Sequence, residues 1–250
     1  MRIMGFSTGA LAYADFRRGL DLLRDTSAKA VELSALRTTE LDPLIAALGT
    51  LDLTRFEFIS VHAPSSVDPQ HERHVVDKLR VVAERAWPIV VHPDSIHDDS
   101  LWRPFGKLMC IENMDKRKPI ARTRDELSQW FDRFPDASLC LDLAHVRQID
   151  PTMTEAYLML RDFKNRLAEV HLSEINFACR HEPISYGAHL ACQQVASLIP
   201  EDVPIILESI VGPEAVEDEI KAAHAALATG ASRPRGRKSR SGAPPKPVHA

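Results

Sequence analysis

Short runs of apolar, often β-branched residues recur along the chain, and most of them end in a polar residue. Between them lie longer stretches in which apolar residues return every three to four positions, the period of an amphipathic helix. These stretches cover residues 15–26, 71–85, 123–134 and 154–167. The short apolar runs that we predict to be strands are residues 3–7, 30–34, 58–62, 88–92, 108–112, 138–142, 168–173 and 204–208.

The eight predicted strands are apolar at nearly every position, as strands are when both faces of a parallel sheet are covered by helices. One strand and its following helix occupy about 28 residues, the length of a βα unit. Eight such units predict an α/β fold, the (β/α)₈ TIM barrel. An open doubly wound sheet is disfavoured, because the first strand is followed by STGALAY rather than a glycine-rich nucleotide-binding turn.

The end of the chain has a different composition. Residues 229–250 contain six Lys and Arg residues among Pro, Gly and Ser, with no acidic residue and little to bury. We predict a disordered basic tail there and a single barrel domain over residues 1–228. Without the tail, 25 basic residues face 35 acidic ones, so the domain is acidic. A solvated extension is favoured over a nucleic-acid-binding arm, since a run of charge specifies little.

The overall composition, 44% hydrophobic and 26% charged, is that of a globular protein. No apolar run reaches the roughly 18 residues of a membrane-spanning helix, and the N-terminus lacks the features of a signal peptide. The four cysteines have no CxxC spacing, which favours free thiols in a reducing compartment. We therefore expect a cytoplasmic protein with no membrane partner.

Metal-ligating residue types occur at the ends of six successive predicted strands, from the third to the eighth. In a barrel the carboxyl ends of the strands meet at one mouth, so these residues become neighbours. Each alone would more often be a rim residue or a helix cap, but the series predicts a divalent-metal site for Zn²⁺, Mn²⁺ or Fe²⁺. Glu32, inside the second run, is assigned behind this site. The ligand candidates are His62, His92, Glu112, Asp142, His171 and Glu208, with His145 one turn after Asp142.

The chain resembles the xylose-isomerase-like TIM barrels, which include endonuclease IV and many sugar isomerases and epimerases. Six ordered segments carry the resemblance: FISVHAP, IVVHPD, CIEN, CLDLAH, EVHLS and ILES. For the isomerases and epimerases it implies one divalent metal on Glu112, Asp142, His171 and Glu208. The endonuclease IV branch has further histidines where His62, His92 and His145 stand. CRHEPISYG (179–187) resembles its DRHENIG segment, which adds His181 and leaves Cys179 where that branch has Asp.

The ligand pattern is nearer to endonuclease IV, which implies two to three ions, with zinc favoured over manganese or iron. One ion would bind His62, His92 and Glu112. A second would bind Glu112 as a bridge, together with Asp142, His171 and Glu208. A third would bind His145 and His181, with Cys179 as a possible thiolate ligand. This interpretation makes the protein a phosphoester hydrolase with Glu112 and Glu208 as its catalytic carboxylates.

Two other functions stay open. One is a single-metal isomerase or epimerase of sugars or sugar phosphates, in which Glu112 or Glu208 moves a proton. The other is a non-catalytic binding module, which the substitution at Cys179 would explain. Basic residues after the fifth and sixth strands are predicted to contact an anionic substrate. They are Lys116, Arg117 and Arg147. The acidic domain and its short loops favour a small phosphorylated or sugar-like substrate over duplex DNA. The sequence does not specify the oligomeric state.

Overall fold

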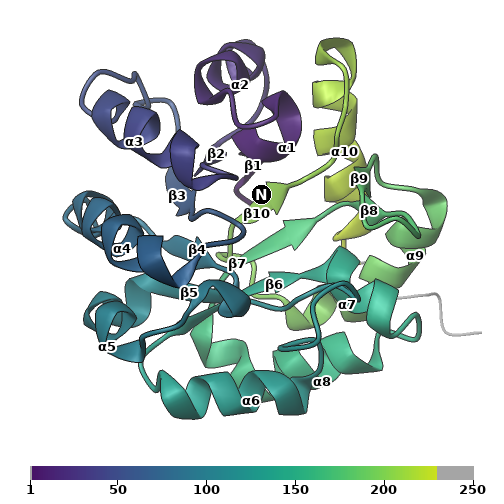
Figure 1. The fold of residues 1–250 in the computed structure, drawn as a ribbon. Coiled ribbons are helices and arrows are strands. Elements are labelled where there is room, and N and C mark those ends of the chain that lie inside the picture. The colour runs from purple at the N-terminus through teal and green to yellow at the C-terminus, as the bar shows by residue number, and fades with distance from the viewer. Residues whose placement is uncertain (1, 230–250) are drawn as a thin grey trace, which may run out of the picture.

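A computed structural model of the protein describes residues 2–229. Its centre is a closed barrel of eight parallel strands in the order β1-β10-β7-β6-β5-β4-β3-β2 (Figure 1). The barrel strands are β1 (Met4–Ser7), β2 (Ala30–Ser34), β3 (Phe58–His62), β4 (Ile89–Val91), β5 (Met109–Glu112), β6 (Ser138–Asp142), β7 (Leu167–Leu172) and β10 (Ile205–Leu207).

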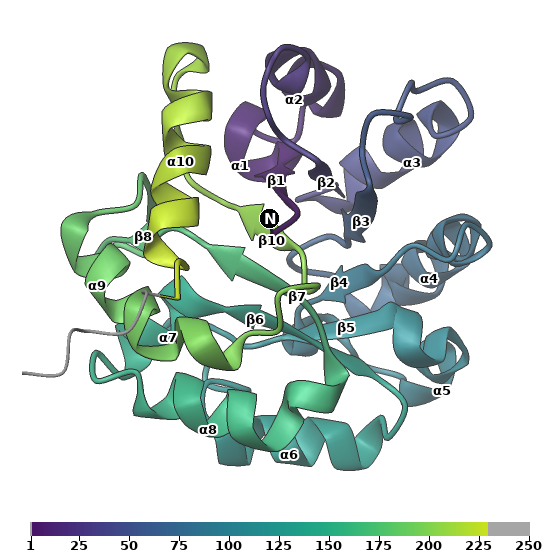
Figure 2. The same cartoon turned by 180° about the vertical axis from the view of Figure 1, so that it is seen from behind.

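The helices lie around the outside of the barrel, with one or two after each strand (Figures 1 and 2). They are α1 (Thr8–Ala12), α2 (Phe16–Leu23), α3 (Thr38–Ala47), α4 (Pro69–Ala83), α5 (Asp99–Trp102), α6 (Arg124–Arg133), α7 (Leu143–Ile149), α8 (Thr154–Phe163), α9 (Tyr186–Val195) and α10 (Val216–Ala226). Single 3₁₀ turns occur at Pro93–Ser95, Arg103–Leu108, Lys164–Arg166, Ala196–Leu198 and Pro213–Ala215.

The predicted (β/α)₈ barrel is confirmed, and each of the eight predicted strands coincides with a barrel strand to within two residues at either end. The assignment of residues 1–228 to one domain stays a prediction, and the predicted tail lies outside the described residues from position 230 onward. Within residues 2–229, no helix is long and apolar enough to cross a membrane. The cytoplasmic location stays a prediction.

Alternate residues of each strand face the barrel interior, because side chains of a strand point to opposite sides in turn. Ser60 and Glu169 show this alternation, since the Ser60 hydroxyl donates to Glu169 Oε2 across the barrel at 2.8 Å. At the amino-terminal strand the barrel closes tightly. A Cβ atom at Gly5 would lie 1.6 Å from the carbonyl oxygen of Ala30 on the neighbouring strand, so only glycine fits there.

A small antiparallel hairpin follows β7 and was not predicted from the sequence. It consists of β8 (Glu174–Ile175) and β9 (His181–Glu182). Two-residue strands are too short to carry a periodic pattern of apolar residues, which explains why the sequence did not reveal them. The hairpin brings His181 to the carboxyl end of the barrel, where its Nε2 lies 3.6 Å from Oε2 of Glu208.

Candidate metal centre

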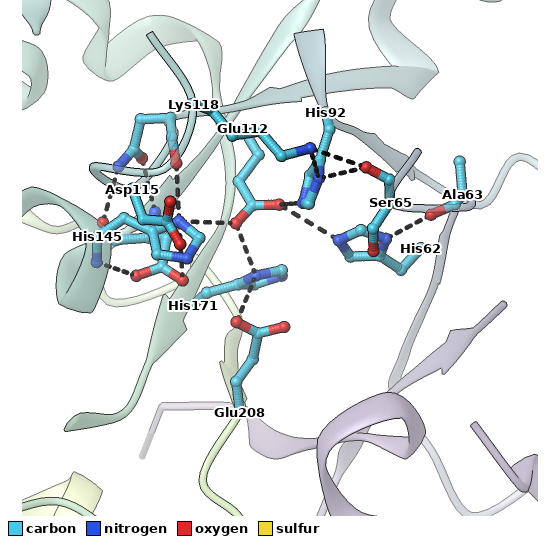
Figure 3. Close-up of polar contacts among 12 residues, drawn as sticks. His62, Ala63, Ser65, His92, Glu112, Asp115, Lys118, His145, His171 and Glu208 are labelled. Atoms are coloured by element: carbon cyan, nitrogen blue, oxygen red, sulfur yellow. Dashed lines mark hydrogen bonds and ion pairs between the residues drawn. The ribbon is translucent and has the colours of Figure 1, made fainter. Parts of the chain in front are cut away.

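Glu112, at the end of β5, lies at the centre of the predicted ligands and is completely buried (Figure 3). Its Oε2 lies 3.2 Å from Nε2 of His62 and 3.0 Å from Nε2 of His92. Its Oε1 lies 3.2 Å from Nδ1 of His145. The two oxygens of one carboxylate therefore face two different sets of ligand candidates, as a bridging position requires.

The rings of His62 and His92 are both fixed by backbone carbonyls. Nδ1 of His62 donates to the carbonyl oxygen of Ala63 at 2.6 Å, and Nδ1 of His92 donates to that of Ser65 at 3.1 Å. In the neutral rings, Nε2 then presents a lone pair toward the Glu112 carboxylate. Both Nε2 lone pairs and the anionic oxygen would then suit a metal ion between them, whereas in a protonated ring Nε2 donates to Glu112 instead.

A second group combines Glu112 with Asp142, His171 and Glu208, which we call the quartet. One donor atom from each residue lies within 4.8 Å of the others. Three buried atoms of the quartet have no hydrogen-bond partner, namely Glu112 Oε1, Asp142 Oδ2 and His171 Nδ1. Each buried polar atom without a partner costs about 1–3 kcal/mol, and a divalent cation would satisfy all three at once. The residues therefore fit a metal.

The carboxylates of the quartet titrate differently. Burial raises the pKa of Asp142 to about 7. Burial acts in the same direction on Glu208, but the nearby His171 and His181 hold its pKa well below the usual range. The pKa of Glu112 is likewise held low, because His92, His145 and His62 outweigh its burial. Glu112 and Glu208 are therefore ionised at neutral pH.

Glu32 lies behind the quartet, within β2, and is completely buried. Its Oε2 is 3.3 Å from Nε2 of His171, on the opposite side of the ring from the atom that faces the quartet. A further buried group, which shares His171 with the quartet, consists of Cys140, Glu169 and His171, with donor atoms within 4.8 Å of one another. Glu169 was not singled out from the sequence, although its position two residues before His171 on β7 directs both side chains inward.

The third predicted ion has a less complete set of ligands. The rings of His145 and His181 lie 5.7 Å apart. The thiol of Cys179 contacts the side chain of Gln148 at 3.3–3.5 Å and packs with Ala144 and Ile175. Among the described residues, these two histidines and Cys179 do not form a group with donor atoms within 4.8 Å. The structure therefore gathers two groups of the predicted ligands, and the number of bound ions stays a prediction.

A cavity of about 640 Å³ opens above the ligands, and Glu112, His62, His92, His145 and Glu208 all line it. Of the three residues predicted to contact the substrate, only Arg117 lines this cavity. Arg117 and its neighbour Lys118 line it. Lys116 is directed to the carbonyl oxygen of Phe177 at 2.5 Å, and Arg147 pairs with Glu174. Neither Lys116 nor Arg147 lines the cavity, because each reaches the β8–β9 hairpin region instead.

No protein-family model and no curated protein matches the chain. Solved structures do match. A 3-keto-D-glucoside 4-epimerase from E. coli covers 88% of this chain and 98% of its own at 12% identity, with a TM-score of 0.53. A proposed sugar phosphate isomerase/epimerase from Anabaena variabilis matches over 88% of each chain at 12% identity, with a TM-score of 0.57.

A xylose isomerase-like TIM barrel protein from Mycobacterium smegmatis, solved in complex with magnesium, is also similar. It covers 86% of this chain and 89% of its own at 14% identity, with a TM-score of 0.53. These likenesses establish the fold. At such identities the substrates and reactions of these proteins do not transfer to this chain, and we found no likeness specific to endonuclease IV among the three.

Proposed function

We propose that the protein is a divalent-metal-dependent isomerase or epimerase of a small sugar-like substrate. The observation that carries this proposal is the convergence of three unpartnered buried atoms of Glu112, Asp142 and His171 beside Glu208. This set of three carboxylates and one imidazole suits one divalent ion, such as Mn²⁺, Zn²⁺ or Fe²⁺. It is also the set that the resemblance to sugar isomerases and epimerases implies.

The similar solved structures support an isomerase or epimerase more than a hydrolase. Two of them are described as acting on a sugar or a sugar phosphate, and the third contains magnesium. The cavity above the quartet has room for a small substrate and lies at the carboxyl ends of the strands, where TIM-barrel enzymes carry their active sites. This location brings any bound substrate next to the quartet.

The residues have distinct roles in the proposed reaction. A metal bound by the quartet would polarise a substrate carbonyl and stabilise negative charge on its oxygen. Glu208 lines the cavity, so its carboxylate is placed to accept a proton from the carbon next to that carbonyl. Glu112, at the end of β5, lines the same cavity, and its carboxylate belongs to both groups of ligand candidates. The Glu32 carboxylate lies 3.3 Å from Nε2 of His171, where its charge can influence the ring that would bind the metal.

Phosphoester hydrolysis is the second candidate, because one observation favours it. Nε2 of His62 and Nε2 of His92 both lie near Oε2 of Glu112. These three atoms could bind another ion. Two neighbouring ions could orient a phosphoester and hold a hydroxide between them. Zinc suits this group best, since two of its three ligands are imidazoles. The number of bound ions therefore separates the two candidates.

The proposed function is tested by hydrogen exchange at carbon. The full chain, loaded with Mn²⁺ or Zn²⁺, is incubated with C5 and C6 ketoses and their phosphates in D₂O, and loss of the C–H signal is followed by proton NMR. We expect metal-dependent exchange that Glu208→Gln abolishes. Cleavage of bis-p-nitrophenyl phosphate without any exchange would support the hydrolase and overturn the isomerase proposal.

A further inference from the structure

We propose that the cavity takes an uncharged sugar or polyol rather than a sugar phosphate, with Tyr13 packing against the face of its ring. This inference rests on the proposed function and specifies the class of its substrate. It follows from two independent features of the cavity wall. One is the pairing of the cationic side chains that line the cavity, and the other is an apolar rim on the opposite side.

Lys118 is occupied by acceptors of the protein itself. Its Nζ lies 2.6 Å from Oδ2 of Asp94 and donates to the carbonyl oxygen of Ser65 at 2.9 Å. Nδ1 of His92 also lies 3.3 Å away, but it donates its proton to the Ser65 carbonyl and accepts nothing from Lys118. Two of the three N–H donors of Lys118 are therefore used by acceptors in the cavity wall. Asp94 also lines the cavity, so the positive charge of Lys118 is neutralised at the surface where a substrate would meet it.

Arg117 is held in the same way by a buried acid. Its Nε lies 2.7 Å and its Nη2 2.5 Å from Oδ2 of Asp115, whose side chain is almost completely buried. The backbone N–H of Arg117 donates to Oδ1 of the same carboxylate at 2.8 Å. Asp115 therefore holds both the backbone and the guanidinium of Arg117. A substrate phosphate would have to compete with this carboxylate at close range.

The balance of charge in the cavity follows from these pairs. Arg117 and Lys118 are the Arg and Lys side chains that line the cavity among residues 2–229, and each has its own carboxylate there. Neither Arg117 nor Lys118 therefore offers an unpaired positive charge to a phosphate dianion. Electrostatics therefore favour an uncharged substrate.

The opposite rim is apolar and carries an exposed aromatic ring. Tyr13 lines the cavity and is 70% exposed, and Ile210 and Leu36 line it nearby. Tyr13 and Ala14 have φ values of 52° and 66°, so two consecutive non-glycine residues adopt the left-handed conformation. Such a conformation is unfavourable for a residue with a Cβ atom, and residues that keep it cluster at functional sites. The strained turn holds the Tyr13 ring at the mouth.

An aromatic ring beside a polar cavity suits a sugar, because one face of a sugar ring presents C–H groups while its edge presents hydroxyls. The C–H face would pack on Tyr13. Asp94, Asp115 and Ser66 line the cavity and offer acceptors or donors to hydroxyl groups. A phosphate group would gain nothing from the apolar rim. The paired cations on one side of the cavity and the apolar rim on the other therefore both favour a neutral carbohydrate.

The test compares matched pairs in the hydrogen-exchange assay: D-xylulose, D-ribulose, D-fructose and D-tagatose, each beside its terminal phosphate. With the metal-loaded full chain, we expect kcat/KM for the best neutral sugar to exceed that for its phosphate by about tenfold or more, since an unpaired charge meets carboxylates. Asp94→Asn should release Lys118 and shift this ratio toward the phosphate. Tyr13→Ala should raise KM about tenfold with little change in kcat, whereas Tyr13→Phe should keep the parent KM.

Tyr157→Ala is the matched control, since Tyr157 is also an exposed tyrosine but does not line the cavity. Its kinetics should equal those of the parent. Exchange confined to the phosphorylated members would overturn the proposed substrate class while leaving the isomerase function standing. No exchange with any of the eight compounds, despite bound metal, would overturn both proposals. Equal effects of Tyr157→Ala and Tyr13→Ala would remove the role of the Tyr13 ring.

Discussion

Nε2 of His92 lies 3.0 Å from Oε2 of Glu112, while the opposite nitrogen of the same ring is fixed by the Ser65 carbonyl. His62 approaches the same oxygen at 3.2 Å. Glu112 thus belongs to two ligand groups at once. One group is the set of ligands that the proposed one-ion isomerase would use, and the other, on the second oxygen of the same carboxylate, is the set that would hold an additional ion.

Replacing His62 separates the two groups. In His62→Ala the quartet keeps all of its ligands, so we expect it to retain one ion per chain and its exchange activity toward ketoses. An ion held with His92 would be lost, because two ligands remain where three stood. Metal content by mass spectrometry and exchange rates by NMR provide the measurement. Loss of both ions and of all exchange would show that the two groups do not act separately.

Glu32 is expected to strengthen metal binding without contacting the ion, because it faces the far nitrogen of His171. Glu32→Gln keeps the shape but removes the charge that orients and polarises the imidazole. We expect metal affinity to fall by about 10–100-fold, as measured by competition with a chelating dye. Glu57→Gln, at an exposed acid, is the control. Equal affinities for Glu32→Gln and the parent would contradict this role.

The metal-free protein should lose stability as pH rises. Burial alone would lower the pKa values of His62 and His145, but neighbouring carboxylates raise them to about 9 and about 10, from 6.5. Glu32 and Glu112 act on His62, and Asp142 and Glu112 act on His145. Because the folded pKa values are raised, protonation stabilises the fold fully below pH 6.5, and this contribution is lost as pH rises toward 9–10.

Metal ions compete with these protons, so the gain in melting temperature on adding metal should increase over the same range. The measurement is the Tm with EDTA and with excess Zn²⁺ or Mn²⁺ between pH 6 and about 9. A metal-induced gain that shrinks as pH rises would contradict the assignment of the histidines as ligands.

Gly5 tests the closure of the barrel. In Gly5→Ala the new methyl group would occupy the position of the Ala30 carbonyl, since 1.6 Å separates the two. Backbone cannot yield as a flexible side chain does, so we expect a loss of about 3 kcal/mol or more in the free energy of unfolding. Gly49→Ala, with nothing within 4 Å of its new Cβ, should change stability little. Urea denaturation compares them, and similar values would contradict the predicted closure.

The fold and most ligand positions could be predicted because each strand carries its own signal. Runs such as residues 138–142 are apolar on both faces, and the polar residue that ends them marks the mouth of the barrel. Asp142 also caps α7, accepting from the backbone N–H of His145 at 2.7 Å. Asp142 is therefore both a helix cap, as this hydrogen bond shows, and a member of the quartet, the two roles that the sequence left open.

The contacts between distant loops could not be predicted in the same way. Lys118 follows β5 and Asp94 follows β4, and their pairing depends on how two loops lie over the cavity. Periodicity says nothing about such tertiary contacts, so the paired state of the cations appears only in the structure. The predicted contacts of Lys116, Arg117 and Arg147 with an anionic substrate rested on their places in the sequence, which do not reveal the protein groups that hold these side chains.

The central claim is that the quartet binds a divalent metal, and metal content tests it most directly. Purified full-length protein, Glu112→Gln and the exposed control Glu57→Gln are each equilibrated with Zn²⁺ or Mn²⁺, dialysed and analysed by mass spectrometry. We predict one or more ions per chain in the parent and the control, and a clear loss in Glu112→Gln, because the shared carboxylate is removed. Equal metal content in all three proteins, or none in the parent, would contradict the account.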